Sequence, residues 1–242
     1  MLQLPLLEEN GFLPDLDAVS AATWQQAAIV WINYPNNPTG AVAPLDFLER
    51  LAGLSAEHGF LLAADEAYTE LWFDVAPHSA LEARARGNVA VFNTLSKRSS
   101  MTGYRSGFVA ANPDLIAALK QFRPSVGTAP QEFVQRASVV AWNDEEHVER
   151  TRAAYRRKRD VLLPTLTRKG IRVAGSEATM YLWLEVPGGE PSDAFAARLL
   201  EQGLVVSPGT FFGRDGAGYW RLALVPTEAE CRRAAGILED VL

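Results

Sequence analysis

The sequence has few of the residues that mark disulfide-bonded, metal-binding or membrane-embedded proteins. Its single cysteine, Cys231, cannot form an internal disulfide and fits a reducing compartment. The three histidines are scattered, without the spacing of metal ligands, so we expect no metal site. No apolar run approaches the roughly 20 residues of a membrane span, and the first residues lack the order of a signal peptide. These absences predict a cytoplasmic protein.

Positive charge is also scarce. The 242 residues carry 23 Lys and Arg against 29 Asp and Glu, a net charge of −6. Binding to a phosphate backbone needs a basic surface, so we expect no nucleic acid as a partner. The short apolar runs likewise predict no membrane as a partner. The basic residues between positions 150 and 159 fit the solvated face of a helix.

Buried apolar runs alternate with helical patterns in the first 130 residues. Strands are predicted at 27–33, 60–64, 89–95 and 107–110, and helices at 44–58 and 113–122. The first helix has Pro44 at its start and Gly59 just past its end, and the second is capped by Asn112. This alternation predicts an α/β layer built on a largely parallel sheet.

The pattern changes after about residue 130. Helices are predicted at 131–142, 144–169, 192–202 and 227–242, and strands that alternate as in a sheet covered on one side at 180–186 and 219–225. A capping box from Thr227 to Glu230 begins the last helix. We therefore expect two domains, 1–145 and a smaller α+β domain at 146–242.

Polar clusters follow three of the predicted strands. They are Asn37-Pro38-Thr39-Gly40, Asp65-Glu66-Ala67-Tyr68 and Asn93-Thr94-Leu95-Ser96-Lys97. Ligands of open parallel sheets bind at the carboxyl ends of the strands. The three clusters therefore predict a binding site at one edge of the sheet.

These segments, in this order, resemble the fold-type I, aspartate-aminotransferase-like enzymes that use pyridoxal 5′-phosphate (PLP). The resemblance rests on Asn37-Pro38-Thr39-Gly40, Asp65-x-x-Tyr68, Ser96-Lys97 with Arg105 eight residues later, and Arg221 on a late strand. Each piece is weak alone, and the four in order are specific. The resemblance implies that residues 1–145 are the C-terminal part of a PLP-binding large domain. It also implies a homodimer that moves an amino group between an amino acid and a 2-oxo acid.

The resemblance assigns a role to each of these residues. Lys97 would hold the cofactor through a Schiff base and then move a proton from the substrate Cα to C4′. Asp65 would keep the pyridine nitrogen protonated, and Asn37 and Tyr68 would donate hydrogen bonds to the phenolate oxygen. The competing roles are a helix N-cap for Asp65, a turn for Asn37, core packing for Tyr68 and a solvated surface position for Lys97.

Further residues of the sequence resemble anion ligands. Arg105 and Thr94 would bind the cofactor phosphate, and Arg221 would bind the substrate α-carboxylate as a bidentate pair. The alternative for Arg221 is a structural ion pair. Arg98 is a candidate for a distal substrate carboxylate or a solvent-facing position.

The second half looks most like the succinyldiaminopimelate aminotransferases of lysine biosynthesis. That subfamily implies N-succinyl-2-amino-6-oxopimelate as substrate, with glutamate and 2-oxoglutarate as the other pair. In the family the Asn-Pro-Thr-Gly motif lies near the middle of the chain, whereas here it begins at Asn37. The upstream part that cradles the phosphate is therefore expected to be absent, and the 242-residue chain to bind PLP weakly and transaminate poorly.

Two other functions stay open. The same cradle serves PLP-dependent β-lyases and decarboxylases, because the motifs do not decide which bond of the bound substrate breaks. A non-catalytic fragment that acts as a binding or assembly module is the second. A nicotinamide-dependent enzyme is disfavoured, because no Gly-x-Gly-x-x-Gly follows a strand.

Overall fold

The computed structural model describes residues 1–127 and 129–242, which form two compact units. Unit 1 comprises Met1–Asp15, Asn36–Ala41 and Arg152–Leu242, and unit 2 comprises Leu16–Pro35 and Val42–Thr151. The change from unit 2 to unit 1 at residue 152 lies inside a helix, whereas the sequence predicts a domain boundary after residue 145. That boundary stays a prediction.

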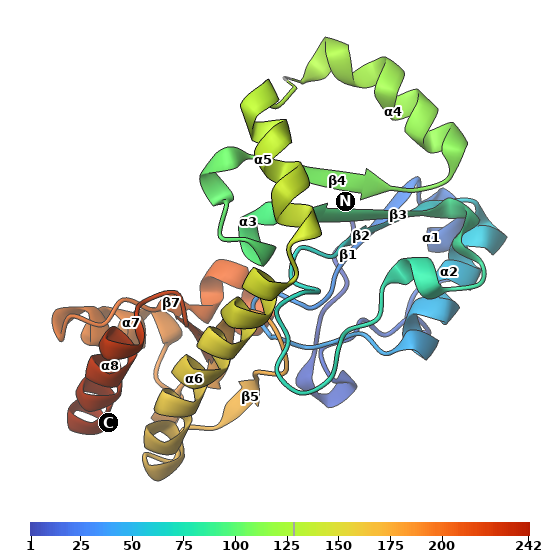
Figure 1. Ribbon diagram of the computed structural model, residues 1–242. Coiled ribbons are helices and arrows are strands. Elements are labelled where there is room, and N and C mark those ends of the chain that lie inside the picture. The colour runs from blue at the N-terminus through green and yellow to red at the C-terminus, as the bar shows by residue number, and fades with distance from the viewer. Residues whose placement is uncertain (128) are drawn as a thin grey trace. The chain divides into compact units, whose positions relative to one another are not determined.

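Unit 2 is built on a four-stranded sheet in the order β1 (Ile29–Asn33), β2 (Leu61–Asp65), β3 (Val89–Thr94) and β4 (Gly107–Ala110) (Figure 1). The first three strands are parallel, and β4 runs antiparallel to β3. Its helices are α1 (Ala21–Gln26), α2 (Leu45–His58), α3 (Leu95–Arg98), α4 (Pro113–Val126), α5 (Glu132–Asn143) and the beginning of α6 (Glu146–Arg168). The predicted, largely parallel α/β layer is confirmed.

Helix α2 shows why the chain folds locally as the sequence predicts. Leu48, Leu51, Ala52 and Ser55 are buried at helical spacing, so one side of the helix packs against the protein interior. Gly59 then ends the helix in the left-handed conformation, which glycine adopts without a steric penalty. The chain returns directly into β2, whose carboxyl end carries one of the polar clusters.

The prediction that β1 is a buried strand is wrong for one of its faces. Ile29 and Trp31 alternate onto the same face of this edge strand, and Trp31 is 60% exposed. The Trp31 ring lies 5.1 Å from the ring of Phe92 on the same sheet. The predicted buried run of β4 is likewise partly open, because Phe108 is exposed beside Trp142. An apolar run reveals a preference for burial but not whether a covering layer is present.

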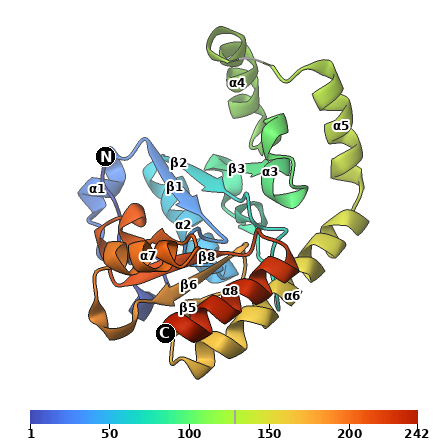
Figure 2. The ribbon, with the colours of Figure 1, turned by 90° about the vertical axis from the view of Figure 1, so that its left-hand side faces the viewer.

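Unit 1 is built on an antiparallel sheet in the order β5 (Val173–Gly175), β6 (Tyr181–Glu185), β8 (Tyr219–Ala223) and β7 (Ser207–Pro208). Its other helices are α7 (Ser192–Glu201) and α8 (Glu228–Val241). Both ribbon views show α8 beside α6 (Figures 1 and 2), and an ion pair of 2.8 Å joins Arg168 to Glu239 between them. The capping box of Thr227 and Glu230 is present at the start of α8, and the predicted α+β pattern is confirmed.

Strand β6 departs from the predicted alternation, because its first four residues are all buried. It is an interior strand of the sheet, with β5 on one side and β8 on the other. One face of the sheet carries Trp220, which contacts Phe195 of α7 at 5.1 Å. The other face carries Trp183, stacked 5.2 Å from Tyr219. Arg221 pairs with Trp183 in the register and so belongs to this second face.

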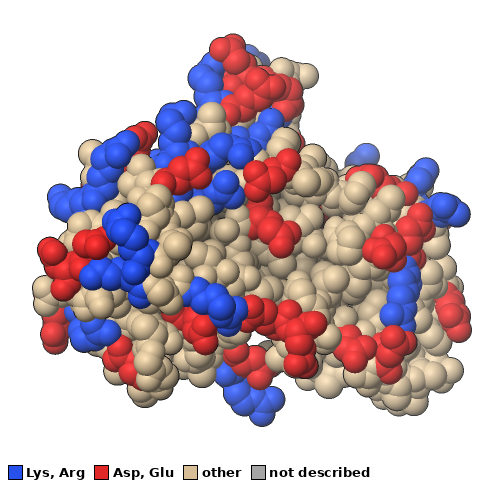
Figure 3. Space-filling model, turned by 90° about the horizontal axis from the view of Figure 1, so that it is seen from below, with Lys and Arg blue, Asp and Glu red and all other residues tan. Residues whose placement is uncertain are grey.

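Short 3-10 turns complete the chain. They are η1 (Glu8–Asn10), η2 (Ala80–Glu82), η3 (Arg86–Asn88), η4 (Thr102–Tyr104), η5 (Pro187–Gly189), η6 (Gly209–Phe212) and η7 (Arg214–Gly216). Within the described residues, no helix has both the length and the apolar content that crossing a bilayer requires. On the face shown in Figure 3, acidic and basic side chains are interspersed among uncharged ones, and neither sign dominates.

Candidate functional site

Lys97 lies in α3, a four-residue helix that follows β3 directly. Thr94 ends the strand in an extended conformation and caps the helix, its Oγ1 accepting a hydrogen bond of 3.1 Å from the backbone N–H of Ser96. Leu95 and Ser96 are buried, and Lys97 itself is half-buried. Its Nζ lies 5.7 Å from the centroid of the Tyr68 ring. The lysine is therefore held at the carboxyl end of a strand, against an aromatic side chain.

Asp65 and Tyr68 come from the neighbouring strand end. Asp65 pairs with Phe92 in the register of β2 and β3, and its Oδ1 accepts a hydrogen bond of 3.1 Å from the N–H of Ala67. Burial raises the pKa of Asp65, whereas the hydrogen bond from Ala67 and the positive charge of Lys97 lower it. The residues after Asp65 form turns and no helix, so the alternative role as a helix N-cap does not apply. Tyr68 is buried.

Thr94 and Arg105, the two predicted phosphate ligands, differ in whether their side chains are already hydrogen-bonded within unit 2. Thr94 Oγ1 lies 3.0 Å from the carbonyl of Ser106 and 3.0 Å from Ser96 Oγ, in addition to capping α3. Arg105 is exposed and has a φ of 54°, and its Nη1 donates a hydrogen bond of 3.0 Å to the carbonyl of Thr102. The hydroxyl of Thr94 is thus engaged in local structure, whereas the Arg105 side chain is open to solvent. The role of both residues as phosphate ligands stays a prediction.

Asn37 lies in a tight turn of unit 1 that the buried side chain of Asn36 organises. Asn36 Oδ1 accepts hydrogen bonds from Thr39 Oγ1 at 2.8 Å and from the Thr39 N–H at 3.3 Å. The turn is fixed to its surroundings by the hydrogen bond of 3.1 Å from the Ala178 N–H to the Gly40 carbonyl. Asn37 is itself half-buried, which leaves part of its side chain accessible.

The structure brings Arg221 and Asn37 together within unit 1. Arg221 Nη1 donates a hydrogen bond of 2.8 Å to Asn37 Oδ1, and Nη2 donates one of 3.1 Å to Ser207 Oγ. The guanidinium carbon lies 4.2 Å from the ring centroid of Tyr181 and 4.8 Å from that of Phe212. Flat guanidinium groups stack well on aromatic rings, so these rings fix its plane.

Arg221 has no carboxylate partner in the described part of the chain. Its Nε is buried and donates no hydrogen bond there. A structural ion pair, the alternative for this residue, is therefore not what holds the side chain in place. The arrangement suits a group that supplies a carboxylate from outside the protein.

Each unit thus brings together its own subset of the predicted residues. In unit 2, Asp65, Tyr68, Thr94 and Lys97 lie at adjoining strand ends, and in unit 1, Asn37 is bonded to Arg221. The cofactor and substrate roles of all these residues stay predictions.

Both roles considered for Arg98 need correction. This residue is 1% exposed, so it does not face solvent. Its Nη1 donates a hydrogen bond of 2.8 Å to the carbonyl of Ala141, and its Nη2 is paired with Glu145, so these donors are not free for a distal substrate carboxylate. Its partners Ala141 and Glu145 lie 43 and 47 residues away along the chain, so no local pattern of the sequence signals this burial.

Glu66 is a residue to which the sequence analysis assigned no role. Its side chain is buried next to Asp65, where Oε1 accepts hydrogen bonds of 2.7 Å from the Ala80 N–H and 3.0 Å from Ser79 Oγ. Burial raises the pKa of Glu66 to about 7. These hydrogen bonds join the loop after β2, which carries Tyr68, to the segment around η2.

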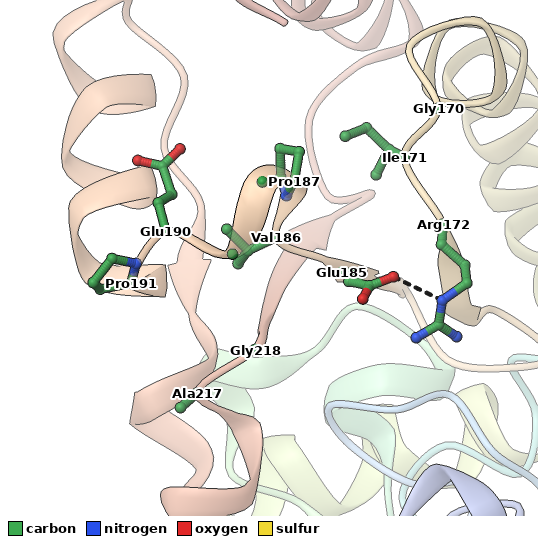
Figure 4. Close-up of a pocket in the computed structure, with 12 residues that line it drawn as sticks. Gly170, Ile171, Arg172, Glu185, Val186, Pro187, Glu190, Pro191, Ala217 and Gly218 are labelled. Atoms are coloured by element: carbon green, nitrogen blue, oxygen red, sulfur yellow. Dashed lines mark hydrogen bonds and ion pairs between the residues drawn. The ribbon is translucent and has the colours of Figure 1, made fainter.

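A cavity of about 510 Å³ lies elsewhere in unit 1, and Figure 4 shows its lining. Glycines and prolines supply much of the wall, and Arg172 is paired with acidic side chains. It bonds Glu185 at 2.8 Å and also pairs with Glu8. None of the predicted site residues lines this cavity. Because Glu8 and Glu185 already neutralise Arg172, the cavity offers little positive charge to hold an anionic ligand.

Solved structures define the class of fold. A probable N-succinyldiaminopimelate aminotransferase from Thermus thermophilus superimposes with a TM-score of 0.91 at 32% identity, over 100% of this chain and 65% of that chain. The aspartate aminotransferase of Thermus thermophilus with maleate gives 0.89 at 33% identity, over 100% and 64%. The architecture is therefore the α/β fold of the aminotransferases.

Residues 1–238 match the family Aminotransferase class I and II, and the chain belongs to this family. Among curated relatives, the LL-diaminopimelate aminotransferase of Oleidesulfovibrio alaskensis is 40% identical over 237 residues, which is 96% of this chain and 61% of that protein. The LL-diaminopimelate aminotransferase of Aquifex aeolicus is 40% identical over 230 residues, 93% and 59% respectively. The chain thus spans about three fifths of the length of these relatives.

Proposed function

We propose that this chain carries the lysine-bearing part of a PLP-dependent aminotransferase. The observation that supports this most directly is the placement of Lys97, half-buried at the carboxyl end of β3 and 5.7 Å from the Tyr68 ring. An ordinary surface lysine would extend into solvent. Lys97 is instead held where a covalently bound ligand would also meet Asp65 and Tyr68.

The residues of unit 2 suit the chemistry of PLP. When bound, PLP supplies an electron sink for charge that develops at the substrate Cα. Burial raises the pKa of the Asp65 carboxyl and the charge of Lys97 opposes that rise; in its ionised form Asp65 would hold a proton on a ring nitrogen. The Tyr68 hydroxyl would donate to a phenolate oxygen, and the same role stays the prediction for the Asn37 amide of unit 1. Arg105 has an exposed guanidinium for a phosphate group.

Lys97 and Arg221 would act directly on the substrate. Lys97 Nζ would hold the cofactor until the substrate amine displaces it, and would then take the proton from the substrate Cα. Arg221 would bind the α-carboxylate with the face of its guanidinium fixed between Tyr181 and Phe212. The hydrogen bond that Arg221 Nη1 donates to Asn37 Oδ1 would orient the guanidinium so that two of its N–H groups meet the two carboxylate oxygens.

We further propose a substrate of the diaminopimelate class. The curated relatives described above are named LL-diaminopimelate aminotransferases, and one similar structure is a probable N-succinyldiaminopimelate aminotransferase. LL-diaminopimelate and N-succinyldiaminopimelate each carry an α-amino acid end, which Lys97 and Arg221 would act on. We retain N-succinyl-2-amino-6-oxopimelate with glutamate as the first pair to test, LL-diaminopimelate as the second, and a homodimer as the working assembly.

The test of the cofactor role is reduction with borohydride after incubation with PLP, followed by peptide mass mapping. We expect a phosphopyridoxyl label on Lys97, its loss in Lys97→Ala, and its retention in Lys120→Ala, a matched change at an exposed lysine of α4. Repeating the labelling at increasing PLP concentrations measures how tightly this chain binds the cofactor. Label spread over many lysines, with none favoured, would refute the proposal and support a non-catalytic binding or assembly module.

The reaction type is tested in single turnovers with each amino donor. Transamination converts the cofactor to pyridoxamine phosphate and releases the matching 2-oxo acid. A β-lyase would release ammonia and a 2-oxo acid without pyridoxamine phosphate, and a decarboxylase would release carbon dioxide. Either outcome would replace the aminotransferase proposal while leaving the role of Lys97 intact.

A further inference from the structure

We propose that Arg98 is a positioning residue that fixes the helix of Lys97 against the loop of Tyr68. This inference rests on the proposed function, because it concerns how the Lys97 amine is placed. It assigns to Arg98 a role that does not involve contact with substrate or cofactor.

Helix α3 is too short to be stable without contacts to the rest of unit 2. It has four residues, and a helix of one turn is unstable by itself because nucleation fixes several dihedral angles for a single hydrogen bond. Lys97 sits in the third of these positions. The orientation of its amine therefore depends on what anchors the neighbouring residues.

Arg98 provides that anchor through four contacts. Its Nη1 donates a hydrogen bond of 2.8 Å to the carbonyl of Ala141, and its Nη2 pairs with Glu145. Its Nε lies 3.5 Å from Glu70 Oε1, and its guanidinium carbon lies 5.1 Å from the centroid of the Trp142 ring. A guanidinium that is 1% exposed requires such compensation, and two carboxylates with one carbonyl supply it.

These contacts connect three segments of unit 2. Ala141, Trp142 and Glu145 lie at the end of α5 and just beyond it, whereas Glu70 follows Tyr68 by two residues. One side chain thus ties the residue next to Lys97 both to a long helix and to the loop that carries the Tyr68 ring. Loss of this link would let the Lys97 amine move relative to Tyr68.

A second tether supports α3 from the following residue. Ser99 Oγ lies 2.9 Å from His147 Nε2, and His147 Nδ1 lies 3.1 Å from Asp144 Oδ2. Both partners belong to the region where α6 begins. The helix of Lys97 is therefore fixed on its C-terminal side by two consecutive residues, of which Arg98 is the buried one.

The experiment compares the rate at which PLP and borohydride label Lys97 in the wild type, Arg98→Met and Arg98→Lys. The same samples report labelling of Lys120, an exposed lysine of the same unit. Arg136→Met is the matched control, because Arg136 is an exposed arginine of α5 paired with Glu132. Hydrogen exchange of the α3 amides is measured without PLP.

We expect Arg98→Met to slow Lys97 labelling by about tenfold to a hundredfold, the range that a displacement of about 1 Å costs a positioned group. Labelling of Lys120 should not change. Arg98→Lys should label Lys97 faster than Arg98→Met does, since an ammonium replaces the charge of the guanidinium but not its several fixed N–H donors. Exchange should quicken in α3 and not in β3. Arg136→Met should match the wild type in all three measurements.

Wild-type labelling and wild-type α3 exchange in a folded Arg98→Met protein would overturn the inference. Equal losses at Lys97 and Lys120 would also overturn it, because they would show a general destabilisation. If Arg98→Met does not fold, Arg98→Lys and Glu145→Gln decide, and wild-type values in both would refute the role. If the wild type takes no label at Lys97, the proposed function fails, and α3 exchange in the variants still decides whether Arg98 anchors this helix.

Discussion

Replacing Glu66 by glutamine should change the pH dependence of stability by an amount that the structure sets. Glu66 is 5% exposed, and burial raises the pKa of its carboxyl to about 7 from the ordinary 4.5. The folded state therefore binds this proton more tightly than the unfolded state does. Between pH 4.5 and pH 7 the carboxyl of Glu66 lowers the free energy of unfolding as the pH rises.

The difference of about 2.5 between the two pKa values corresponds to about 3 kcal/mol, reached when the pH exceeds 7. The glutamine of the variant would resemble the protonated carboxyl, because its amide oxygen can accept from Ser79 Oγ and from the Ala80 N–H. We therefore expect Glu66→Gln to be close to neutral at low pH. At about pH 8 it should be more stable than the wild type by about 2–3 kcal/mol.

The assay is urea denaturation followed by far-UV circular dichroism at about pH 5 and about pH 8, on either side of the raised pKa. The quantity of interest is the difference between variant and wild type, from which the contributions of other carboxyls cancel. Glu82→Gln is the control, because its effect on the free energy of unfolding should hardly differ between about pH 5 and about pH 8. Hydrogen bonds from the Ser79 N–H and from His78 lower the pKa of Glu82, so its stabilisation is present above the ordinary pKa and is lost as the pH falls. An equal effect of Glu66→Gln at both pH values would refute the reasoning.

Three further predictions concern the turn of Asn37, the last helix and Arg221, the proposed ligand of the substrate carboxylate. Gly175→Ala should lower the free energy of unfolding by more than about 2 kcal/mol, because a Cβ at this position would lie 1.8 Å from the Thr39 carbonyl oxygen. The measurement is thermal unfolding, and a melting temperature equal to that of the wild type would contradict this packing. Thr227→Ala should cost about 1 kcal/mol in the same assay through loss of the capping box, and Thr227→Ser should restore it. Arg221→Lys should raise KM for the amino donor by about tenfold with a smaller change in kcat, because one ammonium cannot reproduce the bidentate pair of a guanidinium with a carboxylate. An unchanged KM would exclude Arg221 from carboxylate binding.

Sequence patterns predicted the elements well where the signal is local. Helix α2 begins and ends where Pro44 and Gly59 indicate, and Asn112 caps α4, its Oδ1 accepting from the Leu115 N–H. Helix α1 was missed, although Ser20 was a usable sign, since its hydroxyl accepts from the Thr23 N–H. Such capping residues act over one turn of chain, so the sequence alone is sufficient to recognise them.

Features that depend on distant partners could not be predicted in the same way. An apolar run does not tell whether a strand runs parallel, and β4 runs antiparallel to β3. The burial of Arg98 depends on Glu70 and Glu145, which lie 28 and 47 residues away along the chain. Thr94 shows the same limit, because its hydroxyl lies 3.0 Å from the carbonyl of Ser106, a partner that becomes visible only once strands β3 and β4 are paired.

The uncovered face of β1 gives this protein a built-in optical probe. Of the six tryptophans, Trp24, Trp183 and Trp220 are buried, whereas Trp31 is largely in contact with water. An aqueous quencher such as iodide will therefore reach Trp31 far more readily than these three. Anything that comes to lie over β1, whether a further stretch of polypeptide or a second molecule, will shield that indole and shift its emission to shorter wavelength.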